Sequence, residues 1–173
     1  MDIQVAEAGA LVQARQVARR VASGLRRKLR RAVRAEGALA SLAACPDQAR
    51  QIDARESGRG GWEIERVALW QHPFRADAWA RGVLEGFTRG ASQGLLEETR
   101  VSQRDGQSRF RYLRAVRAER PCLACHGDGV STQVAAALAS RYPQDHPTGF
   151  AEGAVLGAYL LSRPLGPDDL PAR

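Results

Sequence analysis

The N-terminal part of the chain holds a long segment that contains no proline. Between Ile3 and Ala35 an apolar residue recurs every four positions, which is the spacing of one stripe along a helix. The members of this stripe are Val17, Val21, Leu25, Leu29 and Val33. Nine basic and three acidic residues lie within residues 1–36, so this segment carries +6 of the net charge of +7. We therefore predict a basic amphipathic helix over residues 1–36, with Gly37 as its C-terminal stop.

A second helical segment is predicted around Cys45. The apolar stretch Ala38–Ala44 leads to this cysteine, and Pro46 suits the first position of a new helix over Asp47–Arg55. Cys45 would then be the N-cap of that helix, where the positive helix end can stabilise a thiolate. A glycine-rich stretch over residues 57–61 is expected to end the helical region.

The rest of the chain alternates between strand and short-helix patterns. Residues 62–70 predict a strand, His72-Pro73 a turn, and Ala76–Thr88 a short helix. Two alternating runs, 97–103 and 108–116, flank Asp105-Gly106, a dipeptide typical of hairpin turns. A helix over 132–141, a strand over 154–162 and a loose tail complete the pattern. Helices followed by an antiparallel sheet with short helices inserted predict an α+β domain.

Length and composition fit one such domain. The chain has 173 residues, of which 44% are apolar and 26% charged, as is typical of a globular protein with its own core. The longest apolar stretches, such as Gly153–Leu161, fall well short of the roughly 20 residues that a membrane-spanning helix needs. We predict an N-terminal helix over 1–36, a domain over 37–165 and a flexible tail over 166–173.

The residues Cys122-Leu123-Ala124-Cys125-His126 have the form C-x-x-C-H, the attachment signature of c-type haem. Two thiols three residues apart can bond to the two vinyl groups at one porphyrin edge, and the next residue can place its imidazole under the iron. A zinc site completed by Cys45 with His72 or His146 also stays open, although adjacent Cys125 and His126 would struggle to occupy two corners of one tetrahedron. A redox dithiol is expected at the start of a helix in a βαβ unit, and a chance match is a further possibility.

A wider set of landmarks runs along residues 37–165. They are Leu39–Cys45 with Gln48-Ala49, Arg66-Val67 to Pro73, Asp77-Ala78-Trp79 to Phe87, Phe110-Arg111-Tyr112, Pro121–Gly127, Tyr142-Pro143, Thr148-Gly149-Phe150, Gly153 and Gly157-Ala158. In this order they resemble the bacterial and cyanobacterial single-haem c-type proteins with a PAS-like haem-binding domain. The resemblance implies a PAS-like antiparallel sheet with flanking helices and a long N-terminal helix.

The resemblance also implies a set of iron ligands. One haem c would be held covalently by Cys122 and Cys125, with His126 and Cys45 as the axial pair. The chain departs from the family where Gln71-His72-Pro73 replaces an Arg-Asn-Pro turn, which makes His72 a spare candidate ligand. The sixth position could also be taken by His146 or be open or water-filled, and Cys45 could be an inert or disulfide-bonded thiol.

Several further residues are candidates for the surroundings of the haem. The predicted apolar wall consists of Phe110, Tyr112, Leu123, Tyr142 and Phe150, each of which could equally be ordinary core. Arg109, Arg111 or Arg114 would pair with the propionates, unless these arginines are simply solvated. An anionic thiolate ligand favours Fe(III), so we expect a low reduction potential.

Two classes of function remain for such a protein. The first is a periplasmic sensor of redox state or of a diatomic gas such as CO or NO, which would displace Cys45 from ferrous iron. The second is a low-potential electron-transfer cytochrome whose basic helix docks an acidic protein partner. An enzyme is not expected because both axial positions are filled, and export would leave nucleic-acid binding without a role. The long first helix also offers a surface on which two copies could pair.

The expected location rests on the attachment chemistry. Covalent haem attachment takes place outside the bacterial cytoplasmic membrane, yet the start MDIQVAEAG lacks the pattern of a secretory signal. We therefore expect an exported, periplasmic protein in its mature form, with its leader replaced by a start methionine.

Overall fold

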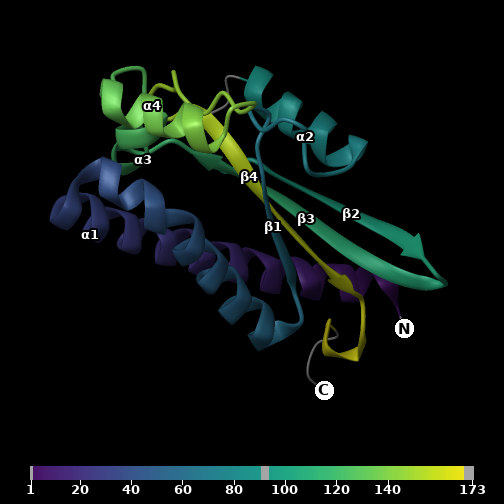
Figure 1. The fold of residues 1–173 in the computed structure, drawn as a ribbon. Coiled ribbons are helices and arrows are strands. Elements are labelled where there is room, and N and C mark those ends of the chain that lie inside the picture. The colour runs from purple at the N-terminus through teal and green to yellow at the C-terminus, as the bar shows by residue number, and fades with distance from the viewer. Residues whose placement is uncertain (1, 91–93, 170–173) are drawn as a thin grey trace.

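A computed structural model of the protein describes residues 2–90 and 94–169. Its longest element is helix α1, Ile3–Gly60, which is interrupted at Gly37, where φ is 80° and ψ is 169°. This backbone conformation lies in a region that glycine tolerates far better than other residues. It divides α1 into a first arm, residues 3–36, and a second arm, residues 38–60. The two arms pack side by side as a hairpin (Figure 1).

The predicted first helix and its stop at Gly37 are thus confirmed, but the second helix differs from the prediction. The second arm is continuous from residue 38 to Gly60, and Pro46 lies inside it. Cys45 is therefore a residue of the helix interior, and its predicted position as an N-cap is wrong. The helix also continues through most of the glycine-rich stretch to Gly60, and the capping residue Gly61 has a left-handed conformation.

Four antiparallel strands form one sheet in the order β1-β4-β3-β2. They are β1 Glu63–Val67, β2 Glu97–Arg104, β3 Gln107–Arg117 and β4 Val155–Pro164. Asp105 and Gly106 join β2 to β3 with φ values of 54° and 75°, as the predicted two-residue hairpin requires. The sheet is long and narrow, so one helix can run along its whole length (Figure 1).

The two faces of the sheet are covered by different helices. The first arm of α1 packs small residues such as Ala10 and Ala14 against Trp62, Phe110 and Leu161 of the sheet. The opposite face carries α2, Ala78–Arg89, whose N-cap Asp77 accepts a hydrogen bond from the amide of Ala80 at 3.1 Å. The members of that second core include Val67, Ala80, Leu84, Leu113 and Leu160.

Two short helices lie at the end of the sheet that is nearest the turn of α1 (Figure 1). They are α3, Arg120–His126, and α4, Thr132–Arg141. Leu42 of the second arm packs with Val134 and Leu138 of α4 in a third, smaller cluster. The prediction of an α+β domain with a four-stranded antiparallel sheet and a long N-terminal helix is confirmed, and the fold is consistent with a PAS-like one.

The segment predicted to be a flexible tail begins at residue 166. Within it, Pro167–Asp169 form a 3-10 turn, and buried Asp169 is paired with Arg163. Gly9 of α1 lies directly against this turn, because a Cβ atom on Gly9 would come within 1.9 Å of the Asp169 carbonyl oxygen. Residues 170–173 are outside the described part of the chain. Within that part, no helix is both long and apolar enough to cross a membrane.

Candidate functional site

Helix α3 carries all three functional residues of the C-x-x-C-H motif. Two residues separate it from the end of β3, and Pro121 lies in its first turn, a position that proline favours. It ends at His126, and a Cβ atom on the next residue, Gly127, would lie 2.7 Å from the carbonyl oxygen of Leu123. A glycine is therefore needed directly after His126 for the chain to leave the helix this closely.

The imidazole of His126 is held in one orientation. Its Nδ1 lies 2.7 Å from the carbonyl oxygen of Pro147. Because a carbonyl can only accept, Nδ1 carries the hydrogen, which leaves the lone pair on Nε2. No hydrogen-bond partner of Nε2 is found among residues 2–90 and 94–169. Histidines that ligate metals commonly use this arrangement, with one nitrogen donating to a carbonyl and the other free for the metal.

The surroundings of His126 favour the neutral ring. Burial lowers the pKa of His126, against the opposing effect of its hydrogen bond to Pro147. The ring of Trp70 lies 5.6 Å from the imidazole, centroid to centroid. The amide of Phe150 donates to the carbonyl of His126 at 2.9 Å, which anchors the end of α3 to the loop that precedes β4.

The three cysteines lie close together although Cys45 is far from the motif in sequence. All three are free thiols of intermediate exposure. Burial is the main effect that raises the pKa of Cys45, and a charge on Cys122 raises it further, whereas Arg66 lowers it. Burial is likewise the main effect that raises the pKa of Cys125, and a charge on Cys45 raises it further. A helix end was expected to favour the Cys45 thiolate, and in the structure the favourable charge comes from Arg66 instead.

A cavity of about 330 Å³ opens beside Cys122, between the first arm of α1 and the sheet. Its lining is apolar over much of its extent and includes Leu25, Leu29, Leu95, Leu96, Val116 and Tyr159. Arg26, Arg114 and Arg117 add positive charge, and Glu119, which pairs with Arg26 at 2.6 Å, adds a negative one. An apolar slot with a few cations is the kind of site that suits a flat, largely apolar ligand with acidic groups.

Arg66 and Tyr159 belong to this site, and the sequence reasoning missed them. Arg66 of β1 donates two hydrogen bonds to Asp53 of the second arm, at 3.0 and 2.7 Å. Its guanidinium also lies 5.0 Å from the centre of the Tyr159 ring, which lines the cavity. A signal was present, because Arg66 alternates in phase with Trp62 and Ile64 and therefore faces the covered side of β1.

The structure places two of the predicted wall residues in the core of the sheet. Phe110 and Tyr112 share one face of β3 as expected, but both are fully buried under the first arm of α1 and neither lines the cavity. The ring of Phe110 packs edge-on against Trp62, and the Tyr112 hydroxyl donates to Glu97 at 2.7 Å. They are core residues of the sheet.

The other predicted wall residues lie around α3. Tyr142 packs in the same cluster as Cys125, and Phe150 pairs with the end of α3 through its backbone. The three arginines that were candidates for pairing with the propionates lie in different places. Only Arg114 lines the cavity, whereas Arg109 pairs with Glu63, and Arg111 pairs with Asp77 beside α2.

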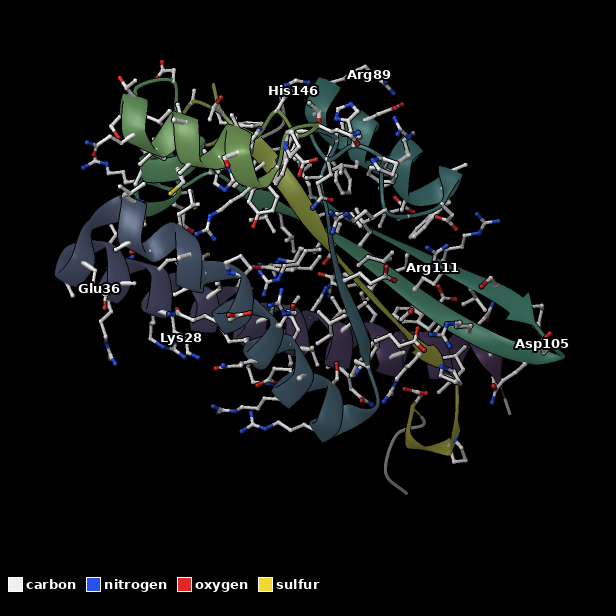
Figure 2. All side chains as sticks on the ribbon, in the orientation of Figure 1. Lys28, Glu36, Arg89, Asp105, Arg111 and His146 are labelled. Carbon is white, nitrogen blue, oxygen red and sulfur yellow. The ribbon has the colours of Figure 1, made fainter. Side chains whose placement is uncertain are left out.

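The two spare candidate histidines lie together at the surface. His72 and His146 are both exposed, and their rings are 5.5 Å apart, centroid to centroid. His146 lies on the side of the molecule remote from α1 (Figure 2). Neither histidine lines the cavity at Cys122, and the same holds for Cys45, Cys125 and His126, so the cavity touches the motif at Cys122. No group of three or more His, Cys, Asp or Glu side chains in the described ranges is arranged to hold a metal ion.

Comparison with known proteins places this site in a family. The model of the Tll0287-like family matches residues 3–164, which is nearly the whole chain. The chain belongs to the Tll0287-like family. The Tll0287-like match includes both arms of α1, the motif on α3 and all four strands, so Cys45, Cys122, Cys125 and His126 all lie within it.

One solved structure supports the same fold. The chain is similar to the cyanobacterial heme-protein Tll0287, with a TM-score of 0.52 and 23% sequence identity over 69% of this chain and 71% of the other. At this identity the likeness shows a shared fold. No curated protein matches the chain.

Proposed function

We propose that this protein binds one haem covalently through Cys122 and Cys125, with His126 as an iron ligand. The observation that carries the proposal is the geometry of α3, where His126 directs a free Nε2 lone pair and Cys122 borders an apolar cavity. The description of the similar protein Tll0287 as a heme-protein supports it. Arg114 lines the cavity and is the cation proposed for a propionate, whereas Arg26 is paired with Glu119 at 2.6 Å.

Cys45 is proposed as the second axial ligand. Its support is the closeness of its thiol to Cys122 and the charge of Arg66, which favours the thiolate. Because burial opposes that charge and raises the pKa of Cys45, the thiol would lose its proton on binding iron rather than beforehand. The residues of this chain therefore supply a neutral imidazole and a thiol whose ionisation is tied to the metal.

The role that fits best is a periplasmic redox or diatomic-gas sensor. Bound haem would supply an iron that changes its oxidation state and its affinity for a thiolate. Cys45 lies on the second arm of α1, which joins the first arm at Gly37 and is tied to the sheet by Asp53 and Arg66. Release of Cys45 would therefore free one contact of this arm and leave a position for CO or NO.

A low-potential electron-transfer cytochrome is the second candidate. It is favoured by the charge of the first arm, since residues 1–36 carry nine basic and three acidic side chains. Such a surface suits an acidic protein partner, with faster association at low ionic strength. No catalytic role is proposed for either candidate.

Extraction with acidified acetone tests the attachment, because a covalently bound haem stays with the chain while a non-covalent one is removed.

Absorption and EPR spectra of the ferric protein test whether Cys45 is the second axial ligand. We expect Cys45→Ala to lose the low-spin thiolate signal, whereas His72→Ala and His146→Ala keep it. An unchanged signal in Cys45→Ala would show that Cys45 is not an iron ligand.

Carbon monoxide separates the two roles. A sensor is expected to bind CO readily when ferrous and to change its proteolysis or hydrogen-exchange pattern around residues 38–60. A ferrous form that stays six-coordinate, does not bind CO and exchanges electrons quickly would favour the electron-transfer role.

A further inference from the structure

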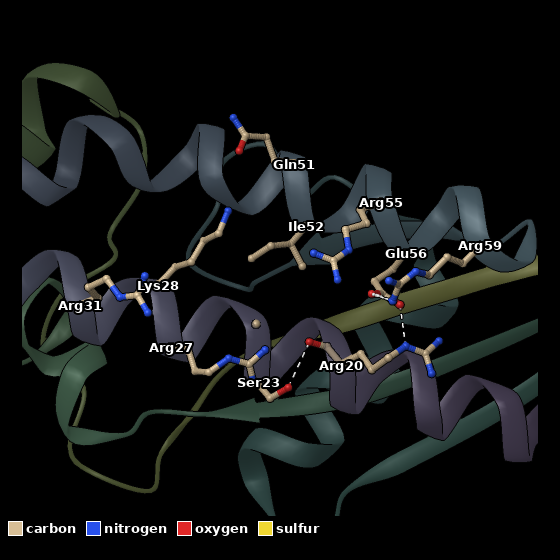
Figure 3. A pocket seen from close by; sticks show the side chains of 11 residues that line it. Arg20, Ser23, Arg27, Lys28, Arg31, Gln51, Ile52, Arg55, Glu56 and Arg59 are labelled. Carbon is tan, nitrogen blue, oxygen red and sulfur yellow. Dashed lines mark hydrogen bonds and ion pairs between the residues drawn. The ribbon is translucent and has the colours of Figure 1, made fainter.

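A second cavity, of about 480 Å³, lies between the two arms of α1 (Figure 3). It shares no lining residue with the cavity at Cys122. Six of its lining side chains are cations, and one is a carboxylate, Glu56. The cations are Arg20, Arg27, Lys28, Arg31, Arg55 and Arg59. We call this cavity the cationic groove.

Within residues 2–90 and 94–169, ion pairs neutralise only a small part of this positive charge. Buried Glu56 pairs with Arg20 of the first arm at 2.6 Å and with Arg59 of its own arm at 2.9 Å. The other four cations have no ion-pair partner among the described residues. They are Arg27, Lys28, Arg31 and Arg55, and all four are exposed. The groove therefore carries a concentrated positive charge.

The cations approach the groove from both sides. Lys28 extends from the first arm towards the second, and Arg55 extends from the second arm towards the first (Figure 3). The arms come close at this point, because a Cβ atom on Gly24 would lie 3.6 Å from the Ile52 side chain. Like charges facing one another across a narrow gap repel, and an anion between them would relieve this repulsion.

We propose that the cationic groove binds a small polyanion that carries two or more phosphate groups, such as an inorganic polyphosphate or a nucleoside polyphosphate. The volume is in the range of small-molecule sites. Arginine forks match phosphate oxygens in geometry as well as charge, and lysine adds a point charge. The groove is concave and has cations on both walls, so a compact ligand contacts more of them than a flat surface does.

An anionic lipid membrane is a less suitable ligand for the cationic groove. Ile52 is the only large apolar side chain in the lining, so the groove offers little to acyl chains. A bound polyphosphate would instead bridge the two arms, and binding to the folded form alone raises thermal stability. This effect gives a readout that does not depend on the haem.

Titration of the full-length protein with inorganic tripolyphosphate at physiological ionic strength tests the proposal. Calorimetry should detect one site, and the ligand should raise the Tm. In Lys28→Gln/Arg55→Gln the affinity should fall about tenfold or more, because two charge-assisted contacts are lost. The matched control is Arg19→Gln/Arg30→Gln, which removes the same charge from exposed positions outside the groove and should bind as the unaltered protein does.

Three results would overturn the proposal. They are no binding of tripolyphosphate by the unaltered protein, an equal loss of affinity in both double variants, and binding to phosphatidylglycerol vesicles without binding to tripolyphosphate. Circular dichroism without ligand checks that each variant folds. Should Lys28→Gln/Arg55→Gln not fold, Arg27→Gln/Arg31→Gln provides the same comparison and should show the same loss.

Discussion

Replacing Asp53 with asparagine should loosen the second arm of α1 from the sheet, close to Cys45. Asp53 accepts two hydrogen bonds from Arg66, at 3.0 and 2.7 Å, and these link the arm to β1. The side chains are 26% exposed for Arg66 and 17% exposed for Asp53, so the pair is largely removed from water. The substitution leaves the charge of Arg66 without its carboxylate and keeps the shape of the side chain.

The expected loss of stability follows from this burial. Breaking a fully buried ion pair from one side costs about 3–5 kcal/mol. Arg66 remains in contact with Tyr159 and is partly hydrated, which reduces the cost to about 2 kcal/mol. In a chain of this length each kcal/mol lowers the Tm by roughly 2–4 °C, so a decrease of roughly 4–8 °C is expected in calorimetry.

A matched control lies on the same arm. Asp47 also pairs with an arginine, Arg50, but the two side chains are 65% and 72% exposed. Asp47→Asn should therefore change the free energy of unfolding by less than about 0.5 kcal/mol. Equal Tm decreases in Asp53→Asn and Asp47→Asn would refute the idea that the pair between Asp53 and Arg66 holds the arm on the sheet.

Three further predictions concern the sheet. Hydrogen bonds from Arg15 and then Tyr112 keep the pKa of Glu97 below its usual range. The stability that this shift provides is present above the unfolded pKa of about 4.3 and is lost as the pH falls. In acid titrations, the free energy of unfolding of Glu97→Gln should therefore depend less on pH below about pH 4 than that of the unaltered protein. Tyr112→Phe should lose about 1 kcal/mol in urea unfolding, and a loss near zero would contradict the hydrogen bond to Glu97. Gly157→Ala should lose about 1–3 kcal/mol, since its Cβ atom would lie 2.7 Å from the Val67 carbonyl oxygen; an unchanged urea midpoint would contradict this close approach.

The elements that the sequence predicted well are those with strong local signals. The four-residue spacing before Gly37 indicated the first arm and its end, and Asp105-Gly106 indicated the hairpin of β2 and β3. The helix over Thr132–Arg141 was predicted with the bounds that the structure has. In each case a periodic run and its own turn or cap residue agree, so no distant contact is needed to define the element.

The errors arose where tertiary packing outweighs such local signals. Pro46 suggested a helix start, yet the second arm continues through it because residues on both sides pack, Leu42 against α4 and Ile52 near the first arm. Likewise, alternation showed that Phe110 and Tyr112 share a face of β3, but not that the first arm covers this part of the face. The C-x-x-C-H motif was enough to identify the candidate site residues on α3. Arg66 and Tyr159 lie on β1 and β4, so their positions beside the site follow only from the pairing of these strands in the sheet.

The central claim is that Cys122 and Cys125 bond covalently to one haem, and intact-mass spectrometry tests it most directly. The protein should be produced in a host equipped for cytochrome maturation and analysed under denaturing conditions. We predict the mass of the chain plus one haem, and the bare chain for Cys122→Ser/Cys125→Ser. A bare-chain mass for the unaltered protein, or a haem adduct that persists in the double variant, would contradict the claim.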